Sequence, residues 1–153
     1  MISMPTTEQV ILDCRRELLD VVLPAVTDEA VKVAVQMLEN VLRNTATRSA
    51  HEIAWMIDEA GTMISFARDV GTAHPGSAEL DQALSACGSA ASSLHLHDVV
   101  HHYNSAGDAL SCAIETAMAA GDHDRTMRAT DMLEARVTRE LQITGEWGMV
   151  GRG

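Results

Sequence analysis

Residues 28–69 read DEAVKVAVQMLENVLRNTATRSAHEIAWMIDEAGTMISFARD, and this stretch decides the fold. Small or apolar residues recur in it at steps of three or four without a change of phase, at Val31, Val35, Leu38, Leu42, Ala46, Ser49, Ile53, Met56, Ala60, Met63 and Ala67. Such spacing places side chains on one face of an α-helix. A single helix of this span would be about 63 Å long, more than the diameter of roughly 40 Å expected for a compact chain of this size. We therefore predict either a bend near residues 44–47 or, preferably, one continuous or gently bent helix that a second subunit covers in a homodimer.

The sequence before this stretch predicts a shorter helix. Thr6 and Gln9 have the spacing of a capping box, and an apolar stripe with helical spacing follows them. Pro24 lacks the N–H that a helix interior needs. We therefore predict a helix from residue 6 to about residue 22, after a disordered start over residues 1–5.

The sequence after this stretch predicts further helices. Residues 71–77 contain Pro75 and two glycines and are typical of a turn. A helical pattern then runs to residue 120, and it weakens over residues 87–93, where small residues indicate either a break or a close approach of two helices. Gly121 and Asp122 end that run, and a last helix is expected to extend to about Thr144.

These patterns predict an all-α protein. Apolar residues make up 46% of the chain and aromatic residues only 3%, a composition that favours helices over strands. We predict an up-down bundle of four to five helices, with one or two long helices of 30–42 residues, that forms a single domain over residues 6–144. Residues 145–153 are rich in glycine and are expected to form a flexible tail.

Charge and cysteine usage narrow the class of partner. The chain has 22 acidic and 11 basic residues, and its formal net charge is −11. Because this charge repels phosphates and anionic lipid headgroups, we expect neither nucleic acid nor a membrane as partner. The three cysteines are widely spaced, and neither a signal peptide nor a long uncharged apolar run is present. We therefore expect a cytoplasmic protein with reduced thiols.

The first candidate site is a polar segment within the long helix. Helical spacing gives one face a set of large polar or aromatic side chains: Arg48, Glu52, Trp55 and Glu59, with His51 beside them. One interpretation is an ordinary Arg48–Glu52 pair next to a packed tryptophan. The other is a polar cluster or interface that also includes Arg43. The zinc-protease motif His-Glu-x-x-His begins at His51 but fails, because Trp55 stands where the second histidine belongs.

The second candidate site is rich in histidine. On a helix, His97, Asp98 and His101 are spaced so that they can reach one zinc or iron ion. Two histidines make only half a site, so further ligands would have to come from a facing helix, from His51, Glu52 or Glu59. A solvated ridge of histidines and a pH-responsive contact are the alternatives. The Glu-x-x-His motif of di-iron bundles is absent.

Three short stretches resemble a known family. The runs LLDVVLP (18–24) and LENVLR (38–43), with AHEIAWM (50–56), are similar to a family of small, uncharacterised, all-helical bacterial proteins. The genes of that family often neighbour aminoglycoside-phosphotransferase-like kinases and acyl-CoA dehydrogenases. The resemblance covers about residues 10–60 and matches at Arg43, Glu52 and Trp55, without implying a catalytic role for them. It implies an accessory role beside a kinase-like or acyl-CoA-metabolising enzyme.

The expected function follows from what the motifs lack. No phosphate-binding loop or nucleophile elbow is present, and no spacing selects a cysteine–histidine pair. We therefore expect a non-enzymatic accessory or interaction protein that acts as a homo-oligomer or with a metabolic enzyme. The alternatives are a metal-binding bundle with a His/Asp/Glu site that holds zinc or iron, and a bundle with a small-ligand pocket lined by methionines and Trp55.

Overall fold

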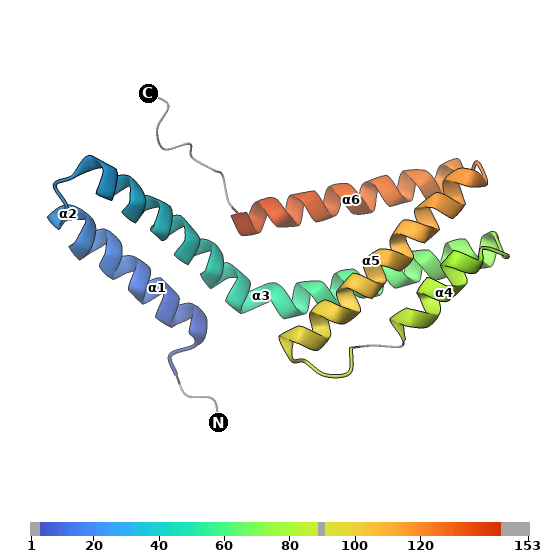
Figure 1. Cartoon of the computed structure of the whole chain (residues 1–153), viewed down its shortest axis with the longest axis horizontal. Coiled ribbons are helices and arrows are strands. Elements are labelled where there is room, and N and C mark those ends of the chain that lie inside the picture. The colour runs from blue at the N-terminus through green and yellow to red at the C-terminus, as the bar shows by residue number, and fades with distance from the viewer. Residues whose placement is uncertain (1–3, 89–90, 145–153) are drawn as a thin grey trace. The chain divides into compact units, whose positions relative to one another are not determined.

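Helices make up nearly all of the described structure. A computed structural model describes residues 4–88 and 91–144, which form helices and short connections with no strand among them. The elements are α1 (Thr7–Glu17), η1 (Leu18–Val22), α2 (Leu23–Ala25), α3 (Glu29–Ala73), α4 (Ala78–Cys87), α5 (Leu96–Ala119) and α6 (His123–Thr144) (Figure 1). The prediction of an all-α helical bundle is confirmed. Residues 1–3 of the predicted start and the whole predicted tail, 145–153, lie outside the described residues.

The chain divides into two compact units. The N-terminal unit comprises residues 1–52 and 138–153, and the core unit comprises residues 53–137. Our expectation of a single domain over residues 6–144 stays a prediction, because this division does not show whether the units fold separately. No helix within residues 4–88 and 91–144 combines the length and the apolarity needed to cross a membrane.

The long helix over residues 28–69 is confirmed. Helix α3 has 45 residues and is unbroken at residues 44–47. Asp28 begins it, because the carboxylate of Asp28 accepts hydrogen bonds from the backbone N–H groups of Ala30 and Val31 at 2.8 and 3.2 Å. The helix continues four residues beyond the predicted end, to Ala73. Pro75 restricts the residue before it, and Gly76, with φ of 108°, completes the turn.

Helix α1 begins as predicted and continues farther than predicted. The Thr6 hydroxyl accepts from the Gln9 N–H, and the Gln9 side chain accepts from the Thr6 N–H, so the capping box is confirmed. The predicted end near residue 22 is wrong, because helical structure continues through Pro24 to Ala25. The wider π-helical turn of η1 precedes Pro24, which stands in the first turn of the short helix α2.

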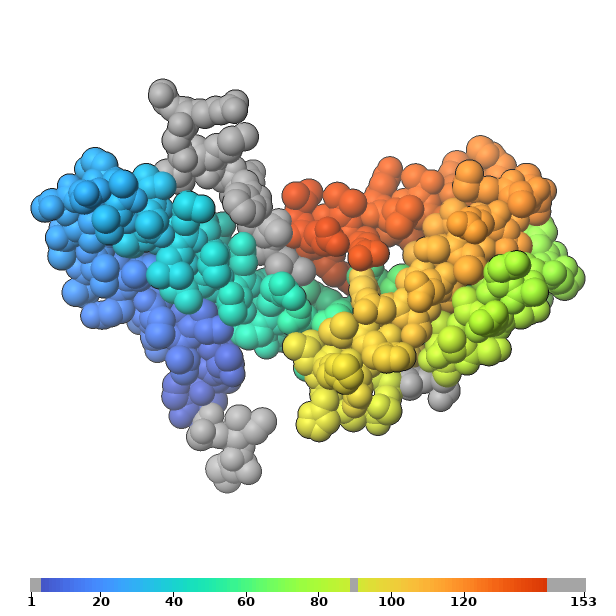
Figure 2. All heavy atoms as spheres, in the orientation of Figure 1, coloured from blue at the N-terminus to red at the C-terminus, as the bar shows by residue number. Residues whose placement is uncertain are grey.

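The N-terminal unit is a helical hairpin with very little core. Helices α1 and α2, in blue, lie beside the first half of α3 (Figures 1 and 2), and Arg15 of α1 forms an ion pair with Glu39 of α3 at 2.5 Å. Among the described residues of this unit, only Ala46 is buried. The hairpin therefore removes little apolar surface from water by itself.

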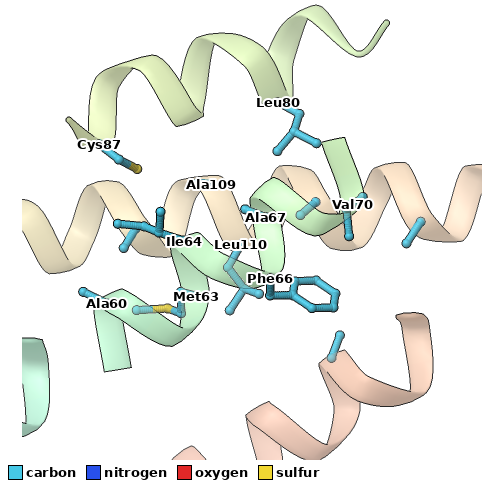
Figure 3. Packing of buried hydrophobic residues seen from close by; sticks show 14 residues of the cluster. Ala60, Met63, Ile64, Phe66, Ala67, Val70, Leu80, Cys87, Ala109 and Leu110 are labelled. Carbon is cyan, nitrogen blue, oxygen red and sulfur yellow. The ribbon is translucent and has the colours of Figure 1, made fainter. Parts of the chain in front are cut away.

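The core unit contains nearly all of the buried apolar side chains. Its cluster joins Met63, Phe66 and Val70 of α3 to residues of the other three helices (Figure 3), including Leu80 of α4, Leu110 of α5 and Ala129 of α6. Helix α5 contributes a row of fully buried small residues at helical spacing: Ala106, Ala109, Ala113 and Ala117. Small side chains let neighbouring helices approach closely, so this cluster is narrow and densely packed.

Short connections join the helices of the core unit. The predicted weakness over residues 87–93 is a break, because α4 ends at Cys87 and Gly88 has φ of +62°. Ser77 caps α4 through the Leu80 N–H at 3.3 Å, and Asp122 caps α6 through the Arg125 N–H at 3.1 Å. The predicted end of the last helix, at about Thr144, is confirmed.

Candidate interaction surface

The predicted polar segment lies entirely on α3, where several of its members have separate partners. Arg48 pairs with Glu52, with Nε to Oε1 at 2.9 Å and a second contact through Nη2, so the i,i+4 pair is confirmed. Arg43 donates to the Asn40 side chain at 2.9 Å. Both arginines belong to the N-terminal unit. An exposed pair of this kind stabilises a helix by only about 0.3–0.5 kcal/mol.

The remaining members have different surroundings. Glu59 in the core unit lies 3.6 Å from Arg136 of α6, and the Arg136 guanidinium stands 5.7 Å from the Tyr103 ring centroid. Trp55 is half-buried in the core unit, and His51 is exposed in the N-terminal unit. The carboxylate of Glu59 is therefore paired with the guanidinium of Arg136.

The predicted metal ligands are occupied or exposed. The Ser93 hydroxyl donates to Asp98 at 2.6 Å and accepts from the His95 N–H at 3.0 Å, which holds the start of α5. The Ser93 hydrogen bond lowers the pKa of Asp98. His97 and His101 are exposed. No group of three or more His, Cys, Asp or Glu side chains in the described ranges is arranged to hold a metal ion, so zinc or iron binding stays a prediction.

Cys87 is the most enclosed of the three cysteines. Its Sγ donates to the Ser105 carbonyl at 3.1 Å, and the thiol is buried. Burial raises the pKa of the Cys87 thiol, so the thiolate that a nucleophile requires is disfavoured.

An ionic network that the sequence analysis missed joins the end of α3 to the start of α6 in the core unit. Arg125 bridges two carboxylates, those of Asp69 at 3.1 Å and Asp122 at 2.7 Å. His74 Nε2 also contacts Asp122 at 2.7 Å, and Arg128 contacts Asp69 at 2.8 Å. The partners are 48–59 positions apart in the chain, apart from the local Asp122–Arg125 pair, so no local spacing indicates them.

This network makes stability depend on pH. Hydrogen bonds from His74 and Arg125 hold the pKa of Asp122 far below its usual range. A carboxyl whose pKa is lower in the folded chain favours folding above its unfolded pKa of about 4 and loses that contribution as the pH falls further. We expect Asp122→Asn, which retains a capping side chain, to lower the melting temperature at pH 7, and we expect this deficit to shrink progressively as the pH falls below about 4. Thermal melts over this range test the prediction. Asp124→Asn, an exposed change in the first turn of α6, should leave the pH dependence unchanged; parallel curves for wild type and Asp122→Asn would contradict the assignment.

The first half of α3 has two sides of opposite character. Toward α1 lie half-buried residues, including Lys32, Glu39 and Arg43. Away from it lies a surface of exposed residues without any charge, which we call the outer face: Ala30, Val31, Val33, Ala34, Met37, Leu38, Val41 and Thr45. Its five large side chains are 40–60% exposed. The apolar side chains of this helix segment are therefore concentrated on the side that faces water.

The outer face includes part of the apolar stripe that we expected a second subunit to cover. Val31 and Leu38 belong to that stripe, and in the single chain they are 47% and 49% exposed. The same stripe is buried at Ala60, Met63 and Ala67 in the core unit. In the single chain, the side of α3 that holds Val31 and Leu38 is exposed, whereas Glu39 pairs with Arg15 of α1.

Comparison with known proteins leaves these surfaces as the basis for assigning a function. No family model, curated protein or solved structure matches the chain.

Proposed function

We propose that the chain is a non-enzymatic helical interaction protein that acts as a homodimer, with the outer face of α3 as the contact between the two copies. The observation that carries this proposal is the outer face itself, a set of eight exposed residues on one side of a helix without a charged residue among them. Contiguous exposed apolar surface is uncommon on monomeric proteins and is typical of contact surfaces.

Charge favours a second copy as the occupant. The formal net charge of −11 makes two copies repel each other over most of their surfaces. The outer face places no charge opposite its own copy when two such faces meet around a twofold axis. Two copies that meet through this part of the described surface therefore bring no like charges into direct contact.

The size of the outer face indicates a contact of modest strength. Five large side chains at 40–60% exposure, together with three small residues, offer roughly 500 Å² per copy, or about 1,000 Å² in the dimer. This value lies below the range of about 1,200–2,000 Å² that stable specific complexes bury in total, and it is typical of weaker, reversible contacts. We therefore expect a dissociation constant on the order of micromolar.

The small core of the N-terminal unit supports the same proposal. Ala46 is the only buried residue among those described there, whereas the core unit has a cluster of fourteen. A two-helix hairpin with so little buried surface gains stability when a second hairpin covers it. Dimerisation would supply the burial that the single chain lacks.

Sedimentation equilibrium at several salt concentrations tests the proposal. We expect the mass to rise from the monomer value of 16.4 kDa toward twice that value as protein concentration passes through the micromolar range. Added NaCl should tighten the dimer, because salt screens the repulsion between acidic chains and does not weaken an uncharged contact. A constant monomer mass would point to a different partner on this face, and dissociation by salt would show an ionic contact elsewhere; either result would overturn the proposal.

A further inference from the structure

A separate groove lies within the core unit. It encloses about 430 Å³ and is lined by Ile57, Gly61, Ile64, Ser65 and Arg68 of α3, by Ala91 and Leu94 of the connection before α5, and by His102 of α5. Its volume falls within the range of about 300–1,000 Å³ typical of small-molecule sites. The lining residues of α3 follow one stripe from Ile57 to Arg68, about 16 Å along the helix.

The two ends of this groove differ in chemistry. Ile57 stands at one end of the α3 stripe and Arg68 at the other, while Leu94 adds an aliphatic wall that is 70% exposed. The groove therefore pairs a long aliphatic surface with a cation at one end.

The polar groups of the groove are available to a ligand. Within the described residues, the Arg68 guanidinium makes no hydrogen bond or ion pair. His102 directs Nδ1 to the Cys87 carbonyl at 3.2 Å, which leaves Nε2 for another partner. No carboxylate lines the groove. By contrast, Asp58 and Asp131 lie in the wall of one neighbouring groove, and Asp13 lies in the wall of another.

Gly61 provides an independent observation. A glycine inside a helix is unfavourable relative to alanine and is usually retained for close packing or for an unusual backbone conformation. Neither reason applies to Gly61, because its φ is not positive and a Cβ placed there would meet nothing within 4 Å. The missing side chain keeps the middle of the α3 stripe open, between Ile57 and Arg68.

We propose that this groove binds a small aliphatic monocarboxylate. The carboxylate pairs with the Arg68 guanidinium, whose planar donors match a carboxylate in two-point contact, and the His102 Nε2 side borders the same end. The aliphatic tail lies along α3 over Gly61 toward Ile57 and Leu94, where it removes apolar surface from water. In a chain with a net charge of −11, affinity for an anion requires such a local cationic site.

Three probes with the same tail and different heads test the proposal. Octanoate, octanol and octylamine are titrated into the full-length protein and followed by calorimetry and by amide NMR shifts. We expect octanoate to bind about tenfold or more tightly than octanol, in line with the gain from a charge-assisted hydrogen bond. Octylamine should bind more weakly than octanoate, although the overall charge of the protein attracts it. Equal binding of octanoate and octanol, or no binding of octanoate at millimolar concentration, would overturn the proposal.

Two variants examine the ends of the groove separately. Arg68→Gln should weaken octanoate binding at least tenfold and leave octanol binding unchanged. Gly61→Leu should remove the binding of both probes, because the new side chain enters the open space. Gly107→Leu is the matched control: Gly107 also lies inside a helix with nothing within 4 Å of a Cβ, and it does not line the groove. Thermal melts verify that each variant folds. An octanoate affinity that is unchanged in Arg68→Gln, or octanoate binding that persists in Gly61→Leu, would contradict the site. These results are independent of whether the chain dimerises.

Discussion

Replacing Met37 by glutamate is expected to convert the proposed dimer into monomer. Met37 is 60% exposed on the outer face of α3, and in the single chain its side chain projects into water. The substitution should therefore leave the monomer folded. In the dimer it would place an uncompensated carboxylate from each copy in an apolar contact, where each charge is desolvated and like charges repel. We expect the dissociation constant to rise at least about 100-fold, which corresponds to roughly 2.7 kcal/mol.

Met118→Glu is the matched control for this result. Met118 lies on α5, is 62% exposed and also stands in a helix, so the change in charge and in residue type is the same. Light scattering coupled to size exclusion, at concentrations where wild type is dimeric, should give the monomer mass for Met37→Glu and the dimer mass for Met118→Glu. Equal masses for the two variants would show that the outer face of α3 is not the contact.

Leu80→Ala is expected to cause the largest loss of folding stability. Leu80 of α4 is fully buried, and its Cδ2 would lie 3.6 Å from a Cβ placed at Gly71 of α3, so two helices come close together around it. Truncation removes buried methyl groups and leaves a cavity that closely packed helices fill only in part. Such changes typically cost about 2–5 kcal/mol, and we expect about 3 kcal/mol here.

Urea denaturation followed by circular dichroism measures this loss. Leu96→Ala serves as the control, because Leu96 is 46% exposed at the start of α5 and its truncation should change the free energy of unfolding by less than about 1 kcal/mol. Leu80 belongs to the core unit and not to the outer face of α3, so Leu80→Ala should not change the equilibrium between monomer and dimer. Similar losses for both leucines would mean that the cluster around Leu80 is not the main source of stability.

The local features of the fold were predictable because they depend on neighbouring residues. Thr6, Asp28 and Asp122 mark helix starts through hydrogen bonds to N–H groups within three residues, and each has that role in the structure. The unbroken phase between residues 28 and 69 likewise predicted α3. The helix end predicted from Pro24 was wrong, because a π-helical turn precedes this proline and helical structure continues to Ala25.

The surfaces were less predictable because they depend on which elements meet. Helical periodicity identifies an apolar arc on α3 but not which part of that arc the single chain covers, and Val31 and Leu38 are exposed in it. The partnership of Arg125 with Asp69 joins positions far apart in the chain and has no sequence signature. The groove beside Arg68 is likewise formed by residues from three segments.

The sparse burial of the N-terminal hairpin has a consequence for the lifetime of the protein in a cell. A segment that hides only Ala46 from water opens at little cost, and an opened segment is where proteases cut. Dimerisation would reduce this opening, so newly made chains that remain monomeric would be degraded first. Turnover would then fall as synthesis rises, and the amount of protein that accumulates would increase more steeply than the rate at which it is made.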